Sequence, residues 1–276
     1  MVVIKLIKLM KKYIAFLFIF LVVNVSYAQD TTIVSKESKK IKKERINVLA
    51  KKEEEGVLNY SKQTAVGFKV INDGYGGFVE IGKRLSSSRS LLYQFEISER
   101  KSMKEEKLQN PYYQSTAFVF GKINFFYPVK IGVQYELLLG NKGNRNGVNV
   151  SANFGGGLSL ALLRPYILQV DKGNINFDMV TFNSPDSLYY LYDDSAIYVA
   201  GGPSFSQGWK NLKLKPGIYA KSSLRFDYGK YNEMINGLEV GISAEYYTKD
   251  IPLMVRIDQK RFFMGIYASI LFGKRK

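Results

Sequence analysis

Long runs of strictly alternating residues constrain the fold of this chain more than any other feature. In "GLEVGISAEYYT" one face consists of Leu238, Val240, Ile242, Ala244 and Tyr246, whereas glycine, serine and glutamate fill the other face. Successive side chains of a β-strand point to opposite sides, so a period of two predicts a strand and not a helix. The same pattern recurs in "LLYQFEISER", "VKIGVQYELLL", "VNVSANFGGGLSLAL" and "KLKPGIYAKSSLRFDY".

Turn-forming segments such as "NDGYGG" at 72–77 and "KDIP" at 249–252 separate these runs. We expect an all-β chain of about ten antiparallel strands, within a range of about eight to twelve, because boundaries read from sequence are uncertain by a few residues.

The first 28 residues predict a secretory signal peptide. Four lysines precede an apolar run from Tyr13 to Val25, and Ser26 and Ala28 place small residues before a cut at Gln29. The rival interpretation is a membrane anchor, but the run is shorter than the roughly 20 residues that a spanning helix needs. The chain has no cysteine, so the mature protein offers no thiol for a lipoprotein anchor. We expect secretion and a location in the cell outer membrane.

Alternation alone fits two architectures, a soluble barrel with an apolar interior and a transmembrane barrel with an apolar exterior. Three details favour the second. The polar faces are rich in small residues that suit a narrow lumen. Several apolar faces end in aromatic residues, such as Tyr228 and Tyr246, as bilayer-edge girdles do. The runs are also long enough to cross a bilayer at a tilt. The sequence therefore predicts an outer-membrane type, transmembrane, up-and-down β-barrel, and the soluble barrel remains the alternative.

The last sixteen residues, "RFFMGIYASILFGKRK", read as the strand that closes this barrel. We expect one of its faces to meet the membrane through Phe262, Met264, Ile266, Ile270 and Phe272.

The leader ending in Ala28-Gln29, the terminal "ASILFGKRK" and the segment "LKPGIYAKSSLRFDYGKYNE" resemble a family of outer-membrane β-barrel proteins from Bacteroidota. So does the segment "FGKINFFYPVKIGVQYELLLGNKGNRNGVNVSANFGGGLSLALLRPYIL". The resemblance covers most of residues 58–276 and implies the fold and the location. The family has no established activity, so the resemblance implies no catalytic residues.

Three parts follow from these observations: the signal peptide at 1–28, a basic and partly helical periplasmic arm at 29–58, and the barrel at 59–276. A long connection at 169–195 interrupts the strand pattern, and such connections are usually functional or mobile. The arm is either a solvated segment or a docking segment for a partner or for anionic lipid. We expect contact with outer-membrane lipid, and protein partners bound through residues 34–55 of the arm or through the 169–195 connection.

Assigning the polar faces to the lumen brings together five carboxylates and five cations. Buried carboxylates need partners, so we expect a structural ion-pair network that plugs the barrel. The alternatives are a narrow ion path or a proton-linked gate. The expected members are Glu80, Arg84, Glu96, Lys122, Lys130, Glu136, Lys221, Arg225, Glu239 and Glu245.

The chain contains neither histidine nor cysteine, and it has no G-x-S-x-G elbow. We therefore expect no enzyme activity, with no catalytic, cofactor-binding or metal-binding residues and no cofactor. The formal net charge is +16, but secretion removes the chain from genomic DNA, so we expect no nucleic-acid partner. The expected function is that of a structural or accessory component acting by protein–protein interaction, as a subunit of a cell-envelope assembly. The alternative is a small transport barrel for an ion or a hydrophobic solute.

Overall fold

The structure is a computed structural model, and it describes residues 60–111, 116–142, 147–171, 178–182, 198–229, 233–255 and 257–276. The expected signal peptide and the arm lie outside these residues, as does most of the 169–195 connection. Among the described residues, no helix is both long and apolar enough to cross a membrane.

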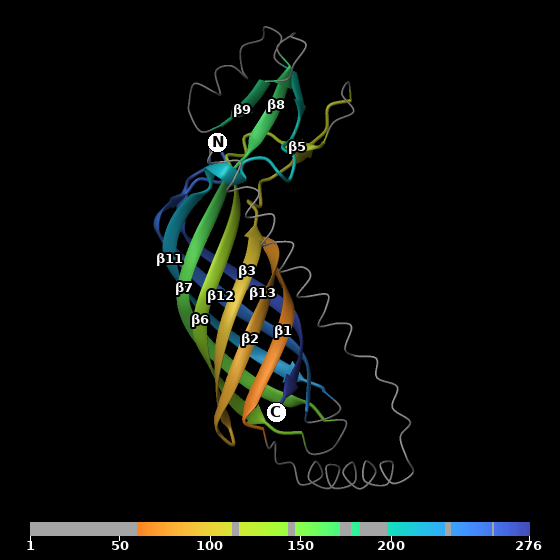
Figure 1. Ribbon diagram of the computed structural model, residues 1–276, viewed down its shortest axis with the longest axis vertical. Helices are drawn as coiled ribbons and strands as arrows, with labels where there is room; N and C mark the ends of the chain where they lie inside the picture. The colour runs from red at the N-terminus through yellow and green to blue at the C-terminus, as the bar shows by residue number, and fades with distance from the viewer. Residues whose placement is uncertain are drawn as a thin grey trace, which may run out of the picture. The chain divides into compact units, whose positions relative to one another are not determined.

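The alternating runs form a closed barrel of eight strands, in the order β1-β13-β12-β11-β7-β6-β3-β2, and each strand is antiparallel to its neighbours (Figure 1). The strands are β1 (Lys62–Ile71), β2 (Gly74–Ser86), β3 (Arg89–Arg100), β6 (Asn124–Gly140), β7 (Asn149–Pro165), β11 (Lys213–Asp227), β12 (Met234–Ile251) and β13 (Lys260–Arg275). The first strand pairs with the last, from Gln63 opposite Arg275 to Ile71 opposite Tyr267. Closure removes the exposed edges that a sheet in lipid could not satisfy.

The predicted fold class is confirmed, and the barrel has eight strands where the sequence suggested about ten. The remaining described strands form two small sheets in the connections. One contains β10 (Tyr198–Gly201), β8 (Ile167–Asp171) and β9 (Asp178–Thr181), and the other contains β4 (Lys107–Leu108) and β5 (Phe118–Val119). These short strands do not belong to the barrel.

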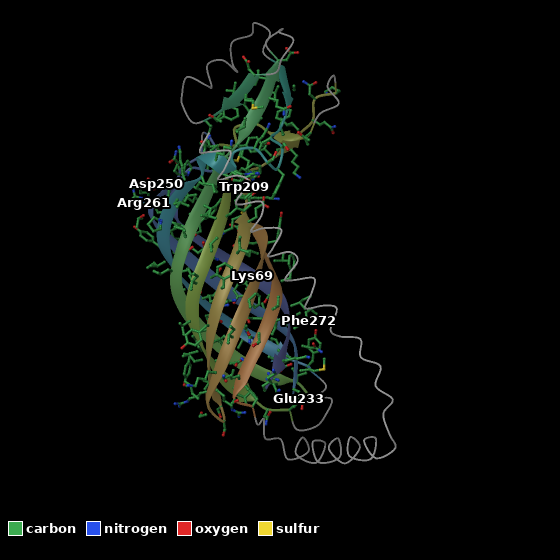
Figure 2. All side chains as sticks on the ribbon, viewed as in Figure 1. Lys69, Trp209, Glu233, Asp250, Arg261 and Phe272 are labelled. Atoms are coloured by element: carbon green, nitrogen blue, oxygen red, sulfur yellow. The ribbon has the colours of Figure 1, made fainter. Side chains whose placement is uncertain are left out.

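The two ends of the barrel differ in the length of their connections. At one end, short connections join β2 to β3, β6 to β7 and β11 to β12. We call it the terminal end, because β1 begins and β13 ends there. At the opposite end, which we call the loop end, residues 101–123 join β3 to β6, and residues 166–212 join β7 to β11. In Figure 1, β5, β8 and β9 lie beyond this loop end. In Figure 2, Trp209 marks the loop end and Glu233 the terminal end.

The barrel is apolar outside and polar inside. On every barrel strand most outward side chains are apolar, and many of them are exposed, including Leu158 (71%) on β7 and Ile266 (64%) on β13. Phe272 (59%) points outward near the terminal end, as Figure 2 shows. A closed barrel with such a belt satisfies its backbone internally and presents its apolar surface to lipid. The chain is therefore a transmembrane β-barrel of the outer-membrane type.

A second buried cluster lies among the loop-end connections, which we call the loop cap (described residues 102–111, 116–123, 166–171, 178–182 and 198–212). Its core is apolar and consists of Phe118, Val119, Ile123, Tyr166, Leu168, Val170 and Phe182. Main-chain bonds join the connections: the Tyr166 amide donates to the Ile123 carbonyl (2.9 Å), and the Gly202 amide donates to the Thr116 carbonyl (3.1 Å). A three-residue 3-10 helix, η1 (Trp209–Asn211), leads from the cap into β11.

Candidate functional site

The lumen is built around Arg225, which projects from β11 and is 2% exposed. Its Nη1 and Nη2 donate to the two carboxylate oxygens of Glu80 at 2.7 and 2.9 Å. Its Nε and Nη2 also donate to Glu239 Oε2 at 3.0 and 2.7 Å. Glu136 Oε1 lies 3.5 Å from Nη1. The planar guanidinium can bind two carboxylates in fixed geometry, which a lysine cannot do.

A second group of ion pairs fills the loop-end half of the lumen. Glu96 accepts from Lys69 at 2.5 Å and from Lys130 at 3.0 Å. Lys130 continues to Glu245 at 2.7 Å, and Glu245 also accepts from Arg100 Nη1 at 2.8 Å. All five side chains are at most 1% exposed. Since a buried charge is costly unless it is paired, this chain of alternating charges is a mutually dependent unit.

Hydroxyl groups and rings connect the two groups. The Tyr267 hydroxyl donates to Glu239 Oε1 at 2.7 Å, while the ammonium of Lys69 lies 4.2 Å from the centre of the Tyr267 ring. Lys221 Nζ lies 3.5 Å from the same Glu239 oxygen. Tyr267 therefore bridges the cluster around Arg225 and the cluster around Glu96. Figure 2 places Lys69 midway along the barrel.

Inward glycines make room for the rings that complete the filling. Gly67 on β1 is directly opposite Phe78 on β2, and a Cβ added to Gly67 would lie 2.3 Å from the Phe78 ring. A Cβ on Gly132 would likewise lie 2.4 Å from the Tyr219 hydroxyl. A barrel of this size has an interior just wide enough for side chains to fill it. Glycine opposite an aromatic ring is one way to achieve that filling.

The terminal end of the lumen is nearly closed. Arg275 Nη2 contacts Asp227 Oδ2 at 2.6 Å, and Gln63 donates to Glu136 at 3.1 Å. The cavity beside these groups, lined by Tyr60, Arg225 and serines of the terminal end, holds only about 20 Å³. That volume suits about one water molecule. Arg225 and its neighbours therefore leave no wide passage in the described barrel.

Eight of the ten predicted lumen residues lie in this network: Glu80, Glu96, Lys130, Glu136, Lys221, Arg225, Glu239 and Glu245. The other two do not. Arg84 lies near the terminal end of β2, where its guanidinium donates to the Ser86 and Ser87 carbonyls. Lys122 precedes β6 in the loop cap, where it pairs with Glu105 at 2.6 Å. Both residues lie close to a connection at an end of the barrel. The alternation of faces along a strand therefore did not predict their partners.

Among the members of the network that the sequence reasoning missed are Lys69, Arg100 and Tyr267. In "GFKVI" every second residue, Gly67, Lys69 and Ile71, lies on the same face of β1, and that face points into the lumen. Arg100 has the parity of Glu96 on β3 and also holds Asp73 of the β1–β2 turn at 2.5 Å. The period of two contained the signal for both residues, but the pairing partners depended on the fold.

The expected membrane-facing side chains of the last strand lie on the outside. Phe262, Met264, Ile266, Ile270 and Phe272 are between 46% and 64% exposed. Their neighbours Tyr267, Ser269 and Leu271 are at most 2% exposed and face the lumen.

No protein-family model matches the chain, and no curated protein matches it. Among solved structures it is similar to Neisserial surface protein A, at 9% identity and a TM-score of 0.37, over 78% of this chain and 96% of that one. It is also similar to the N-terminal β-barrel domain of Pseudomonas aeruginosa OprF, at 11% identity and a TM-score of 0.32, over 77% and 98%. A third is Ail, the attachment invasion locus protein of Yersinia pestis, at 8% identity and a TM-score of 0.34, over 79% and 98%. Likenesses this distant carry no functional argument, and the fold rests on the strand pairing. The resemblance to a Bacteroidota family stays a prediction.

Proposed function

We propose that this protein is a non-conducting barrel of the outer membrane that serves as a structural or accessory component by protein–protein interaction, as a subunit of a cell-envelope assembly. The observation that carries the proposal is the filled lumen. Arg225 binds Glu80 and Glu239 across the interior, and the chain of pairs from Asp73 to Glu96 occupies the loop-end half. Because ion pairs fill the interior of this barrel, we infer that it acts through its outer surfaces.

The loop cap supplies the surface for a partner. It exposes apolar side chains away from the lipid-facing strands, including Leu108 (42%) on β4 and Met179 (65%) on β9. Within the described residues, β9 and β10 are the outer strands of the cap sheet, and outer strands can pair with an added chain. Barrels of this type carry long connections on the extracellular side, so we assign the cap to that side. The arm at 34–55 stays a second candidate for partner binding.

We also propose that the barrel has no catalytic role. The lumen carboxylates are engaged by cations or hydroxyl groups, and no histidine is available as a general base anywhere in the chain.

Two measurements on the full-length protein test the proposal. In planar bilayers we expect no discrete openings, and stable unitary currents would restore the small transport barrel as the better hypothesis. In mild-detergent extracts we expect a stoichiometric companion that the Leu108→Ser/Met179→Ser variant releases. Leu85→Ser is the matched control, since Leu85 is an exposed leucine (56%) near the terminal end. A lone monomer in the extract, or a companion retained by the cap variant, would contradict an interaction through the cap.

A further inference from the structure

A groove of about 300 Å³ lies at the rim of the loop end. It runs between the β1–β2 turn, the first residues after β3 and the connection from β12 to β13. We call it the rim groove, and its lining includes Lys101, Met103, Lys104, Leu253, Ile257, Lys260, Phe262 and Met264. Its volume lies at the lower end of the range for ligand pockets, about 300 to 1,000 Å³. It is separate from the closed terminal end of the lumen.

The floor of the groove is apolar and firmly supported. Leu253 and Phe263 pack against a buried cluster that contains Phe126, Tyr247 and Ile251. The rings of Phe126 and Phe263 lie 5.3 Å apart, and those of Tyr247 and Phe263 lie 6.0 Å apart. Ile251 itself contributes to both the cluster and the groove. The floor of the groove therefore rests on a buried aromatic and aliphatic cluster.

The mouth of the groove joins the lipid-facing belt. Phe262 and Met264 line the groove, and both are outward residues of β13, 53% and 58% exposed. Further along the same face, Ile266 and Ile270 continue the belt toward the middle of the barrel. An acyl chain lying on this face can enter the groove without crossing water, which removes the main cost of extracting it from the bilayer.

The lining of the groove also carries cations. Lys101, Lys104 and Lys260 line the groove, and neither Lys104 nor Lys260 forms an ion pair with a described residue. Lys101 is 3.7 Å from Glu99, in a partly exposed pair of little strength. The acidic lining consists of Asp73, which is already bound to Arg100, and the exposed Asp258. The groove thus offers more positive than negative charge to a ligand.

We propose that the rim groove binds one lipid of the surrounding leaflet whose phosphate head group carries a net negative charge. Part of an acyl chain lies against Phe262, Met264 and Ile257, and the lysines hold the phosphate. An apolar slot continuous with the lipid belt selects a lipid over a soluble phosphate. A cluster of lysines at its edge selects an anionic head group over a zwitterionic one. This site is independent of the partner binding proposed for the loop cap.

The test is native mass spectrometry of the full-length protein in mild detergent with three probes. These are dioleoyl phosphatidylglycerol, dioleoyl phosphatidylcholine and glycerol phosphate. We expect one phosphatidylglycerol retained per barrel, about tenfold in preference to phosphatidylcholine, and no retention of glycerol phosphate. Equal retention of the two lipids would overturn the proposal, because it would reflect annular lipid alone. Retention of glycerol phosphate would also overturn it, in favour of a site for soluble phosphate.

A charge-matched pair of variants locates the binding. Lys101→Gln/Lys104→Gln/Lys260→Gln should lower retention of phosphatidylglycerol by about tenfold or more. Lys210→Gln/Lys213→Gln/Lys249→Gln removes three other loop-end lysines that do not line the groove, and should leave retention unchanged. An equal loss in both variants would show attraction to the whole rim and would overturn the assignment to this groove.

A single substitution at an exposed site tests whether a loss of lipid retention could be due to misfolding. Met103 lines the groove but is 77% exposed, so Met103→Glu adds a carboxylate to the groove without disturbing a core. It should repel the phosphate and lower retention severalfold. Met179→Glu, at a site that is 65% exposed and outside the groove, is the control. Retention unchanged in Met103→Glu would contradict the proposal.

Discussion

The barrel interior and the loop cap are both buried, yet they are built from opposite chemistry. Lys69, Glu96 and Arg225 in the barrel are at most 2% exposed and are held by ion pairs. Leu168 and Val170 in the cap are equally buried and are held by apolar contacts. The two regions belong to one chain, so the difference arises from their surroundings and not from overall composition.

Lipid covers the outside of the barrel, and apolar side chains are stable there. The polar side chains then line the narrow interior. They must pair with one another there, because few water molecules can enter. Water covers the outside of the cap, so its apolar residues collapse inward in the ordinary way. In this protein a buried side chain can therefore be polar or apolar. Its polarity depends on whether lipid or water covers the opposite, outer surface of that region.

The largest expected effect is the loss of the Arg225 guanidinium. Arg225→Met leaves Glu80 and Glu239 facing each other across the lumen without their shared cation. Removing one partner of a buried pair typically costs about 3 to 5 kcal/mol. We expect a loss of that size in the free energy of unfolding, measured in micelles by far-ultraviolet circular dichroism against urea.

The control is Arg225→Met/Glu80→Gln, which neutralises the carboxylate whose two described partners are both atoms of Arg225. It should recover a large part of the lost stability. If Arg225→Met unfolded at the urea concentration of the unchanged protein, the lumen would be hydrated and the contrast with the cap would disappear.

The outer face provides the next test of the comparison. Ile266 is outward near the middle of β13, so Ile266→Lys places a charge in the centre of the lipid. Such a change costs about 2 to 4 kcal/mol at the bilayer midplane and about 0 to 1 near an interface. Phe272→Lys, near the terminal end of the same face, is the control, because it places the same charge closer to the membrane interface. Unfolding in lipid vesicles should separate the two variants, and equal small effects would mean that water covers this face.

The cap responds differently because its core is apolar and local. Leu168 is fully buried in the cap cluster, and Leu168→Ala should remove about 2 to 3 kcal/mol from the stability of the cap. The effect lies toward the low end for leucine because a small cap can partly collapse into the space. Trp209, the single tryptophan, lies at the loop end and reports this change by fluorescence. Circular dichroism of the barrel should stay unchanged, and loss of both signals together would show one cooperative unit.

The parity of each alternating run predicted which face of a strand is enclosed. Glu239 and Glu245 are both inward on β12, and Ile266 and Phe272 are both outward on β13, as a period of two requires. Arg225 and Glu239 are direct neighbours on β11 and β12, so a hairpin register would have found that pair. The pair between Arg225 and Glu80 crosses the barrel between residues 145 apart in the chain, and only closure with a fixed strand number brings them together.

The strand number itself was harder to obtain. β9 and most of β8 lie inside the 169–195 segment, which the alternating pattern indicated only as a long connection, and they pair with each other and with β10 in the cap. About ten strands were expected where eight close the barrel, because strand boundaries read from a sequence are uncertain by a few residues. The rim groove left no local signal, because its lining comes from three connections that are far apart in sequence.

The smallest expected effect concerns an ion pair that anchors a lysine in the described part of the cap, which is otherwise built around an apolar core. Lys122 and Glu105 are 3% and 9% exposed and 2.6 Å apart, and the Lys122 ammonium lies 4.6 Å from the centre of the Phe125 ring. Burial lowers the pKa of Lys122 below its ordinary value by more than the Glu105 carboxylate raises it. The unfolded cap therefore binds more protons than the folded cap between the lowered pKa and the ordinary pKa. It follows that the Lys122 contribution to cap stability rises with pH through that alkaline window.

Lys122→Met should cost about 1 to 2 kcal/mol near neutral pH, because Glu105 is left without its partner. Lys122→Met/Glu105→Gln should recover most of that loss, since no buried charge then remains. The difference in stability between the protein and the double variant, followed by Trp209 fluorescence, should change with pH only in the alkaline window. A difference that stayed constant as the pH rose would mean that the ammonium is solvated in the cap. The cap would then tolerate a charge that the barrel interior accepts only when it is paired.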